Sequence, residues 1–295
     1  MMTYPDFFIV GGTRCGTTSL CAYLKQHPNI FLPKRKELDY YSKSTKTADS
    51  SFSRGFWGHR EWSPIENKQD YLQLFEDSKE DMVVGDGSAT YLMNLDAPKL
   101  ISQDNPNAKI IISLRNPIER THTAYLAQYR SGKETHSFGE SIRRDLSSAT
   151  GKELQNLRSL NSDYYEYVKN YYSYFPKEQI KIIIFEEFIK NPQQTMKEIL
   201  HFLNLSTDIN FEYKQHNPVQ ISKNKISQSI ITSKFFYYIG FALMPAKIRH
   251  YILRQFTTRT KPIMLEKDRD FLKEQYVDSV KKLESLLNRK IPWEI

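Results

Sequence analysis

The chain has 295 residues, and its 42 Lys and Arg against 34 Asp and Glu give a formal net charge of +8 at pH 7. Hydrophobic residues make up 39% and charged residues 26%, a balance that excludes collagen, a long coiled coil and wholesale disorder. One α/β core can reach about 250 to 300 residues, so the length permits a single large domain.

Four short apolar runs, each ending at a polar turn, predict the strands of a sheet, at 7–10, 82–84, 109–114 and 181–185. Helical spacing lies between and after them, at 18–26, 97–102, 118–131, about 137–175 and 192–203. No Pro-, Gly- or Ser-rich linker divides the chain. We therefore predict one α/β domain over 1–295, with a central parallel sheet flanked by helices. Two weakly periodic segments, about 43–70 and 208–262, are expected to be acceptor-side insertions.

The cysteines and the apolar segments indicate where the protein resides. Cys15 and Cys21 lie six residues apart in the first segment, where a short helix would turn their side chains to different faces, so no disulfide or metal framework is expected. No leader precedes the first apolar run, and the longest nearly apolar stretch, 235–246, is shorter than the roughly 20 residues of a membrane helix. We expect a cytoplasmic protein with no transmembrane segment.

The turn after the first strand, GGTRCGTTSL at 11–20, is the most specific feature of the sequence. Gly11 and Gly16 have the spacing of the phosphate-binding pattern GxxxxGK[ST], in which backbone N–H groups and a helix N-terminus surround an anion. Thr17 replaces the Lys of that pattern, and the cation of the loop is Arg14. The pattern predicts an anion site unlike that of an ATPase; the alternative is a tight turn with a helix cap.

This loop resembles that of the sulfotransferases that use 3′-phosphoadenosine 5′-phosphosulfate (PAPS), G-x-x-[KR]-[SC]-G-T-[TS]. A second segment, LRNPIERTHTAY at 114–125, resembles the family's 3′-phosphate motif, with Arg115 in place and Thr123 where the family has Ser. Segments 136–142, 181–203 and 282–293 also look like the family. The resemblance implies a P-loop-like fold, PAPS as donor, PAP as product and no metal. It implies donor contacts from Gly12, Thr13, Arg14, Cys15, Gly16, Thr17, Thr18, Ser19, Arg115 and Thr123.

Sulfuryl transfer needs stabilisation of the leaving oxygen, for which the guanidinium of Arg14 is suited, and a base for the acceptor proton. Segment 33–41, PKRKELDYY, resembles the glycan and bacterial type, which has a Lys-Glu pair, two further residues and two aromatics. In that resemblance Glu37 is the catalytic base. Asp39 and His122 remain alternatives, and Glu37 could instead balance a solvated basic turn.

Segment 85–92, GDGSATYL, resembles a family segment with the order acidic, Lys, Ser, Pro, any residue, Tyr. Gly87 replaces the Lys, so the contribution of that cation is lost. The resemblance implies acceptor contacts from Glu37, Asp39, Ser88 and Tyr91, although turn and core roles would explain the last two equally. The family's basic nucleotide clamp near the C-terminus has no clear match, with scattered candidates at Lys223, Lys225, Arg254, Arg259 and Lys261.

The sequence thus predicts sulfuryl transfer to a hydroxyl, less readily an amine, of a carbohydrate or small-molecule natural product. One alternative is a P-loop kinase or NTPase, which would need ATP and Mg²⁺. Another is a nucleic-acid-binding protein, but the basic residues form no dense stripe, so no nucleic-acid partner is expected. A third is peripheral membrane contact through the aromatic, basic segment 235–256. The acceptor and the oligomeric state are left open.

Overall fold

The computed structural model describes residues 4–42, 65–130, 134–147, 163–213, 221–222, 257–258 and 263–295. Five parallel strands form its central sheet in the order β2-β3-β1-β4-β5. They are β1 (Phe7–Gly11), β2 (Ile30–Phe31), β3 (Val83–Asp86), β4 (Lys109–Leu114) and β5 (Ile180–Ile184). Because the strands are parallel, their carboxyl ends meet at one edge, where ligands bind in open α/β sheets.

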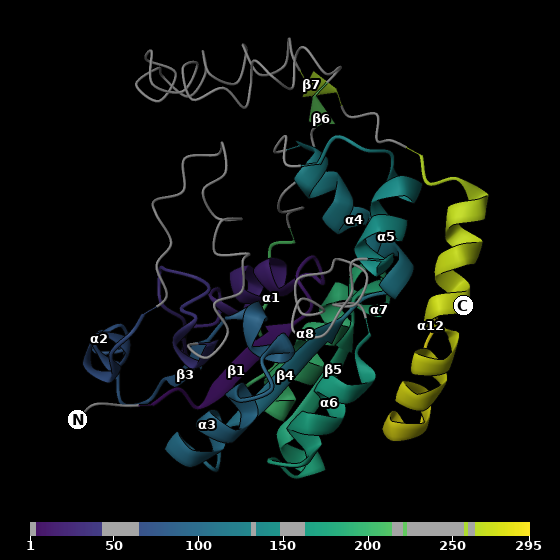
Figure 1. Ribbon diagram of the computed structural model, residues 1–295. Helices are drawn as coiled ribbons and strands as arrows, with labels where there is room; N and C mark the ends of the chain where they lie inside the picture. The colour runs from purple at the N-terminus through teal and green to yellow at the C-terminus, as the bar shows by residue number, and fades with distance from the viewer. Residues whose placement is uncertain are drawn as a thin grey trace, which may run out of the picture.

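Helices cover both faces of this sheet (Figure 1). The α-helices are α1 (Thr17–Leu24), α2 (Lys68–Gln73), α3 (Ala97–Asp104), α4 (Pro117–Arg130), α5 (Phe138–Ser147), α6 (Tyr165–Tyr172), α7 (Phe185–Lys190), α8 (Pro192–Phe202) and α12 (Glu266–Leu287). Short 3-10 helices are η1 (Tyr40–Ser42), η3 (Ala89–Met93) and η6 (Lys177–Gln179). Two antiparallel pieces, β6 (Ile221–Ser222) and β7 (Thr257–Thr258), pair apart from the sheet.

Alternation along β1 sends its side chains to two cores, one on each face of the sheet. Phe8 and Val10 pack in the cluster that takes in residues of α3, α6 and α12, whereas Phe7 and Ile9 pack in the cluster with α1 and α8. Figure 1 shows α12, in yellow, beside α6 at one side of the molecule. The carboxyl-edge loops are thus supported by a core on each face.

The predicted single α/β domain with a parallel central sheet is confirmed. The strand expected at 109–114 has those bounds, and the other three differ by one or two residues. Within the helical stretch expected over 137–175, the described residues form α5 and α6, and 148–162 lie outside the described residues. The two-residue strand β2 was not predicted, because so short a strand has no periodicity to recognise. Of the expected insertions, 43–64 and most of 214–262 lie outside the described residues.

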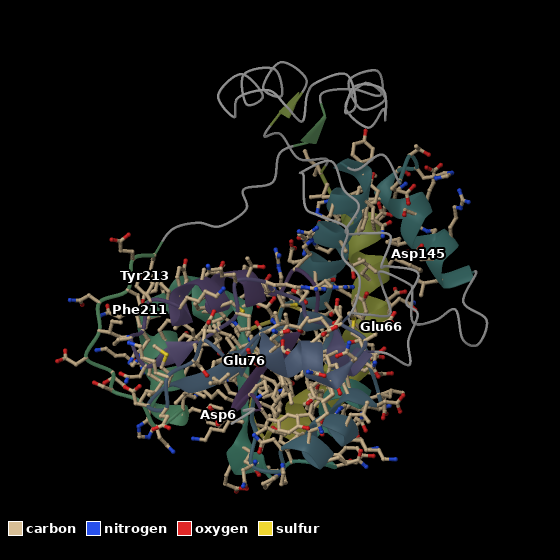
Figure 2. All side chains as sticks on the ribbon, turned by 90° about the vertical axis from the view of Figure 1, so that its left-hand side faces the viewer. Asp6, Glu66, Glu76, Asp145, Phe211 and Tyr213 are labelled. Carbon is tan, nitrogen blue, oxygen red and sulfur yellow. The ribbon has the colours of Figure 1, made fainter. Side chains whose placement is uncertain are left out.

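Residues 208–213, the described start of the second insertion, lie beside α1 and the turn that follows it. Gln26 and Glu212 exchange two hydrogen bonds between side chain and backbone, of 3.1 and 2.8 Å. Tyr213 packs edge-on against Tyr23, with ring centroids 5.0 Å apart; Figure 2 labels Phe211 and Tyr213 at this edge. The chain between 205 and 213 therefore lies against the first helix.

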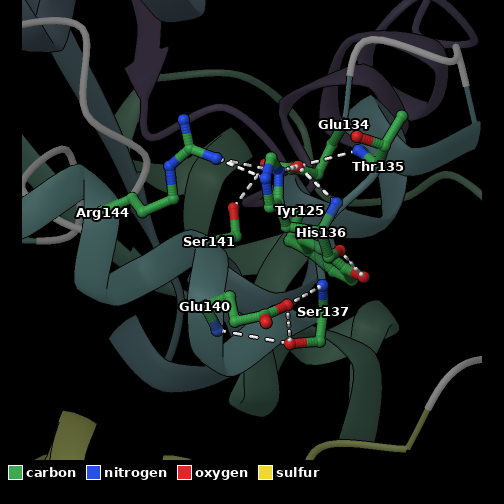
Figure 3. A network of polar contacts seen from close by, with 8 residues as sticks. All are labelled: Tyr125, Glu134, Thr135, His136, Ser137, Glu140, Ser141 and Arg144. Carbon is green, nitrogen blue, oxygen red and sulfur yellow. Dashed lines mark hydrogen bonds and ion pairs between the residues drawn. The ribbon is translucent and has the colours of Figure 1, made fainter.

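Segment 136–142, one of those resembling the family, is a helix start (Figure 3). The Glu140 carboxylate accepts from Ser137 N at 3.0 Å, and Ser137 Oγ accepts from Glu140 N at 3.4 Å, which is a capping box. Buried Glu134 accepts from the backbone N of His136 and from Ser141 Oγ, at 2.9 and 2.5 Å. These contacts stabilise the N-terminus of α5, so the residues of segment 136–142 have a structural role in this helix.

Within the described residues, no helix combines the length and the apolar character needed to cross a membrane.

Candidate active site

The donor loop, defined as residues 11–18, joins β1 to α1. Its backbone turns through left-handed conformations at Arg14, with φ of 73°, and at Gly16, with φ of 86°. A Cβ at Gly16 would come within 2.7 Å of the Phe185 ring, so glycine is required both for the conformation and for the space. Gly16 is also the N-cap of α1 and has no side chain with which to cap the first N–H groups. The helix therefore begins with N–H groups suited to an anion.

Side chains from β4 and α4 hold the donor loop in place. Arg120 is 2% exposed and donates from Nη2 to Thr13 Oγ1 at 2.6 Å and from Nε to Thr13 O at 3.2 Å. Ser113 Oγ donates to Cys15 O at 2.5 Å. Arg120 was not among the predicted site residues, although it lies five residues after Arg115 in the same motif. Its buried guanidinium fixes the course of the loop.

Arg115 lies in the turn between β4 and α4, and Thr123 lies on the second turn of α4. Arg115 Nη1 donates to Arg14 O at 3.1 Å, and the guanidinium stacks 4.7 Å from the centroid of Phe185. Its Nε is buried and has no hydrogen-bond partner in the described part of the chain. Thr123 Oγ1 donates to Glu119 O, one turn earlier in α4, at 2.8 Å.

The carboxylate loop, defined as residues 33–42, follows β2 and approaches the donor loop. Glu37 and Asp39 both have left-handed backbone, with φ of 58° and 56°. The segment after β3 holds this loop through hydrogen bonds from Leu38 N to Ser88 Oγ at 2.8 Å and from Tyr40 N to Tyr91 OH at 3.0 Å. The two left-handed residues thus persist because groups distant in the sequence bond the backbone of the residue that follows each of them.

Asp86, at the end of β3, anchors those two hydroxyls. It is 0% exposed and accepts from Ser88 Oγ at 2.6 Å, Tyr71 OH at 2.9 Å and Tyr91 OH at 3.0 Å. Burial raises the pKa of Asp86 to about 7, although the three hydroxyl donors oppose that rise. Ser88 and Tyr91 are also 0% exposed. They support the carboxylate loop from inside, and the acceptor contacts expected of them stay a prediction.

Glu37 has both carboxylate oxygens engaged. Ala89 N donates to Oε2 at 2.7 Å, and the Lys36 ammonium donates to Oε1 at 2.5 Å. The same ammonium donates to Thr17 Oγ1 at 3.0 Å and to Thr18 Oγ1 at 3.2 Å. Lys36 therefore joins the carboxylate loop to the first turn of α1. In the sequence, Lys36 stood out only as half of a Lys-Glu pair, with no role of its own.

The other candidate bases have different surroundings. Asp39 lies in the carboxylate loop and accepts a hydrogen bond from Thr90 Oγ1. Burial, followed by the negative charge of Glu37, raises the pKa of Asp39 to about 6. His122 lies on α4, where its ring packs 4.9 Å from the centroid of Phe138. The structure thus brings Glu37 and Asp39 together on one loop and gives His122 an aromatic environment.

A cavity of about 180 Å³ lies between α1 and the carboxylate loop, lined by residues that include Thr18, Cys21, Lys25, Arg35, Lys36 and Gly87. No group of three or more His, Cys, Asp or Glu in the described ranges could hold a metal ion. The candidate clamp residues Lys223, Lys225, Arg254, Arg259 and Lys261, and the segment 235–256, lie outside the described residues.

Fold and site together define an α/β enzyme with an anion-binding loop at the carboxyl edge of its sheet and a carboxylate beside that loop. The profile of the Sulfotransferase family matches residues 5–208, and the chain belongs to this family. This confirms the family expected from the two motifs and the transferase class of the enzyme.

Known relatives agree with this assignment. A sulfotransferase structure from Alicyclobacillus acidocaldarius is 28% identical, covers 98% of both chains and has a TM-score of 0.72. Carbohydrate sulfotransferase 15 of Homo sapiens is 27% identical over 252 residues, which cover 68% of this chain and 44% of that protein. The bifunctional heparan sulfate N-deacetylase/N-sulfotransferase 3 of Mus musculus is 28% identical over 217 residues, 70% of this chain and 23% of that protein. The chain thus spans less than half the length of these two curated relatives.

Proposed function

We propose that this sulfotransferase moves a sulfuryl group from PAPS to a hydroxyl, less readily an amine, of a carbohydrate or small-molecule natural product, with Glu37 as the general base. One observation carries the proposal: the Glu37 carboxylate, fixed by the amide of Ala89, is joined through one ammonium to the hydroxyls that begin α1. The carbohydrate and heparan sulfate enzymes among the relatives support a sugar acceptor.

The residues present fit a donor with two phosphate-bearing ends. The uncapped start of α1, with the hydroxyls of Thr17 and Thr18, suits the end that carries the sulfuryl group. The buried Nε of Arg115, which lacks a partner among the described residues, suits the second phosphate. PAPS supplies the activated sulfuryl group at this site.

In this proposal, Glu37 accepts the proton of the acceptor group. As the acceptor oxygen bonds to sulfur, the bond between sulfur and the phosphate oxygen breaks, and its electron pair stays on that oxygen. The acceptor proton passes to Glu37 and then to water. Arg14 and the N-terminus of α1 stabilise the charge on the leaving phosphate.

A labelled-donor assay across an acceptor panel tests this function. Glu37→Gln should lower turnover by about 10²- to 10⁴-fold, the usual contribution of a general base, while PAP binding is kept. Glu166→Gln on α6, whose side chain is 68% exposed, is the matched control and should behave as wild type. Full turnover of Glu37→Gln would overturn the base assignment. Turnover that required ATP and Mg²⁺ in place of PAPS would overturn the reaction.

A further inference from the structure

Lys36 is the point where the two halves of the site touch. Its ammonium has three N–H donors, and three oxygens lie within hydrogen-bond distance: Thr17 Oγ1, Thr18 Oγ1 and Glu37 Oε1. The two hydroxyls belong to the first turn of α1, and the carboxylate is the proposed base. The ammonium of Lys36, which lies outside the donor loop, thus contacts Thr17, the position where the phosphate-binding pattern has a lysine.

We propose that Lys36 is a catalytic residue whose ammonium contacts the transferring end of the donor and stabilises the leaving phosphate oxygen. This inference rests on the sulfotransferase function proposed above. It assigns to Lys36 the cationic contact that Thr17 cannot make.

The ammonium is charged in its resting position. Burial alone would lower the pKa of Lys36, but the negative charge of Glu37, with smaller help from Cys21 and Asp39, raises it above the usual lysine value. The Lys36 side chain is 22% exposed, so an incoming anion can reach the ammonium while the surroundings stay dry enough to strengthen the contact.

The fold also reserves the space through which Lys36 reaches α1. A Cβ at Gly87 would lie 2.5 Å from Cys21 Sγ and 3.9 Å from Lys36 Cε. The Cys21 thiol therefore excludes a side chain at position 87, where the sequence lacks an expected lysine. The Lys36 stem passes beside the same position, so Lys36 supplies a cation in that neighbourhood.

During the reaction, negative charge is lost at Glu37 and gained at the leaving phosphate oxygen, the two groups that the ammonium of Lys36 would contact. When Glu37 takes the acceptor proton, it becomes neutral and its attraction for the ammonium falls. At the same time, the electron pair of the breaking bond between sulfur and the phosphate oxygen makes the leaving oxygen more negative. The ammonium is then drawn toward the leaving group as the bond breaks, which is stabilisation in the transition state.

The test compares Lys36→Met with Lys34→Met, an exposed lysine of the same loop. We expect Lys36→Met to lower kcat by about 10²- to 10³-fold, the range for removal of one transition-state donor, and to lower PAP affinity by a smaller factor. Lys36→Arg should recover at least part of kcat. PAP titration shows that each variant is folded. Equal kcat for Lys36→Met and Lys34→Met would overturn the proposal, while turnover of PAPS by wild type would leave the proposed function intact.

A double variant separates catalysis from mere positioning of Glu37. If Lys36 contacts the leaving group, Lys36→Met should still lower kcat at least about tenfold in the Glu37→Gln background, because the two side chains then act on different atoms. If the double variant equals Glu37→Gln alone, Lys36 acts only through Glu37, and the proposal is wrong.

Discussion

The two loops that form the site differ in how their functional groups are brought together. The donor loop has its glycines, hydroxyls and helix start in one continuous segment, and Arg120 and Ser113 fix its backbone from beneath. The carboxylate loop has two left-handed non-glycine residues and depends on hydroxyls from a segment about 50 residues later. The groups of the donor loop that suit an anion are thus contiguous in the sequence, although Ser113 and Arg120, 98 and 107 residues away from their partners, hold them in place. The proposed base instead sits in a loop whose backbone is bonded by hydroxyls of another segment.

The largest effect is expected from Arg120→Ala on the donor side. It removes a fully buried side chain and leaves Thr13 O and Oγ1 without their donors, so the free energy of unfolding should fall by more than about 3 kcal/mol. PAP affinity should fall with it. Urea unfolding and calorimetry measure both, with the exposed Arg289→Ala as control. Unchanged PAP affinity would show that the loop does not depend on this support.

Gly16→Ala should have the next largest effect. The left-handed backbone opposes the change, as does the Phe185 ring, which lies 2.7 Å from the position that the new methyl group would take. We expect a cost of about 2 kcal/mol in the free energy of unfolding. PAP affinity should fall, whereas the pH dependence of kcat at saturating donor should stay as in wild type. A shift in that pH profile would mean that the two loops are not separable.

Tyr91→Phe tests the acceptor side. It removes the hydroxyl that accepts from Tyr40 N and donates to Asp86, and should lower the free energy of unfolding by about 1 to 3 kcal/mol. Since the carboxylate loop loses a contact, kcat should fall while PAP affinity is kept. Tyr174→Phe on the exposed surface is the control. A loss of PAP affinity equal to that of Gly16→Ala would contradict the comparison.

Taken over a single pH unit, the smallest expected effect is a pH slope from Asp86. Its pKa is about 7 in the folded state against 3.8 for the ordinary value, so the unfolded chain loses this proton first as pH rises. Between about pH 4 and 7 the contribution of this group should therefore lower the free energy of unfolding by up to about 1.4 kcal/mol per pH unit, and it should level off above pH 7. Asp86→Asn should remove that slope. Urea unfolding at pH 5, 6 and 7 checks this, and identical slopes for wild type and variant would refute it.

The sequence was sufficient for the features that are local or periodic. The strand at 109–114 is a run of apolar residues buried in the sheet, and the donor loop is a pattern within ten residues. The functions of Lys36, Ser88 and Tyr91 were not readable, because each depends on which distant atoms the side chain meets. Ser88 and Tyr91 bear hydroxyls that suit a substrate pocket equally well, and their hydrogen bonds to the carboxylate loop are evident only in the fold.

Phe185 contacts both ends of the proposed donor site without offering a polar group to either. Its ring lies where a side chain at Gly16 would be, and it also stacks against the guanidinium of Arg115. The start of α1 and the guanidinium of Arg115 are thereby spaced by one aromatic ring, the first residue of α7. An apolar side chain thus sets the separation between the two groups proposed to hold the donor, and a smaller side chain at this position would leave that separation unfixed.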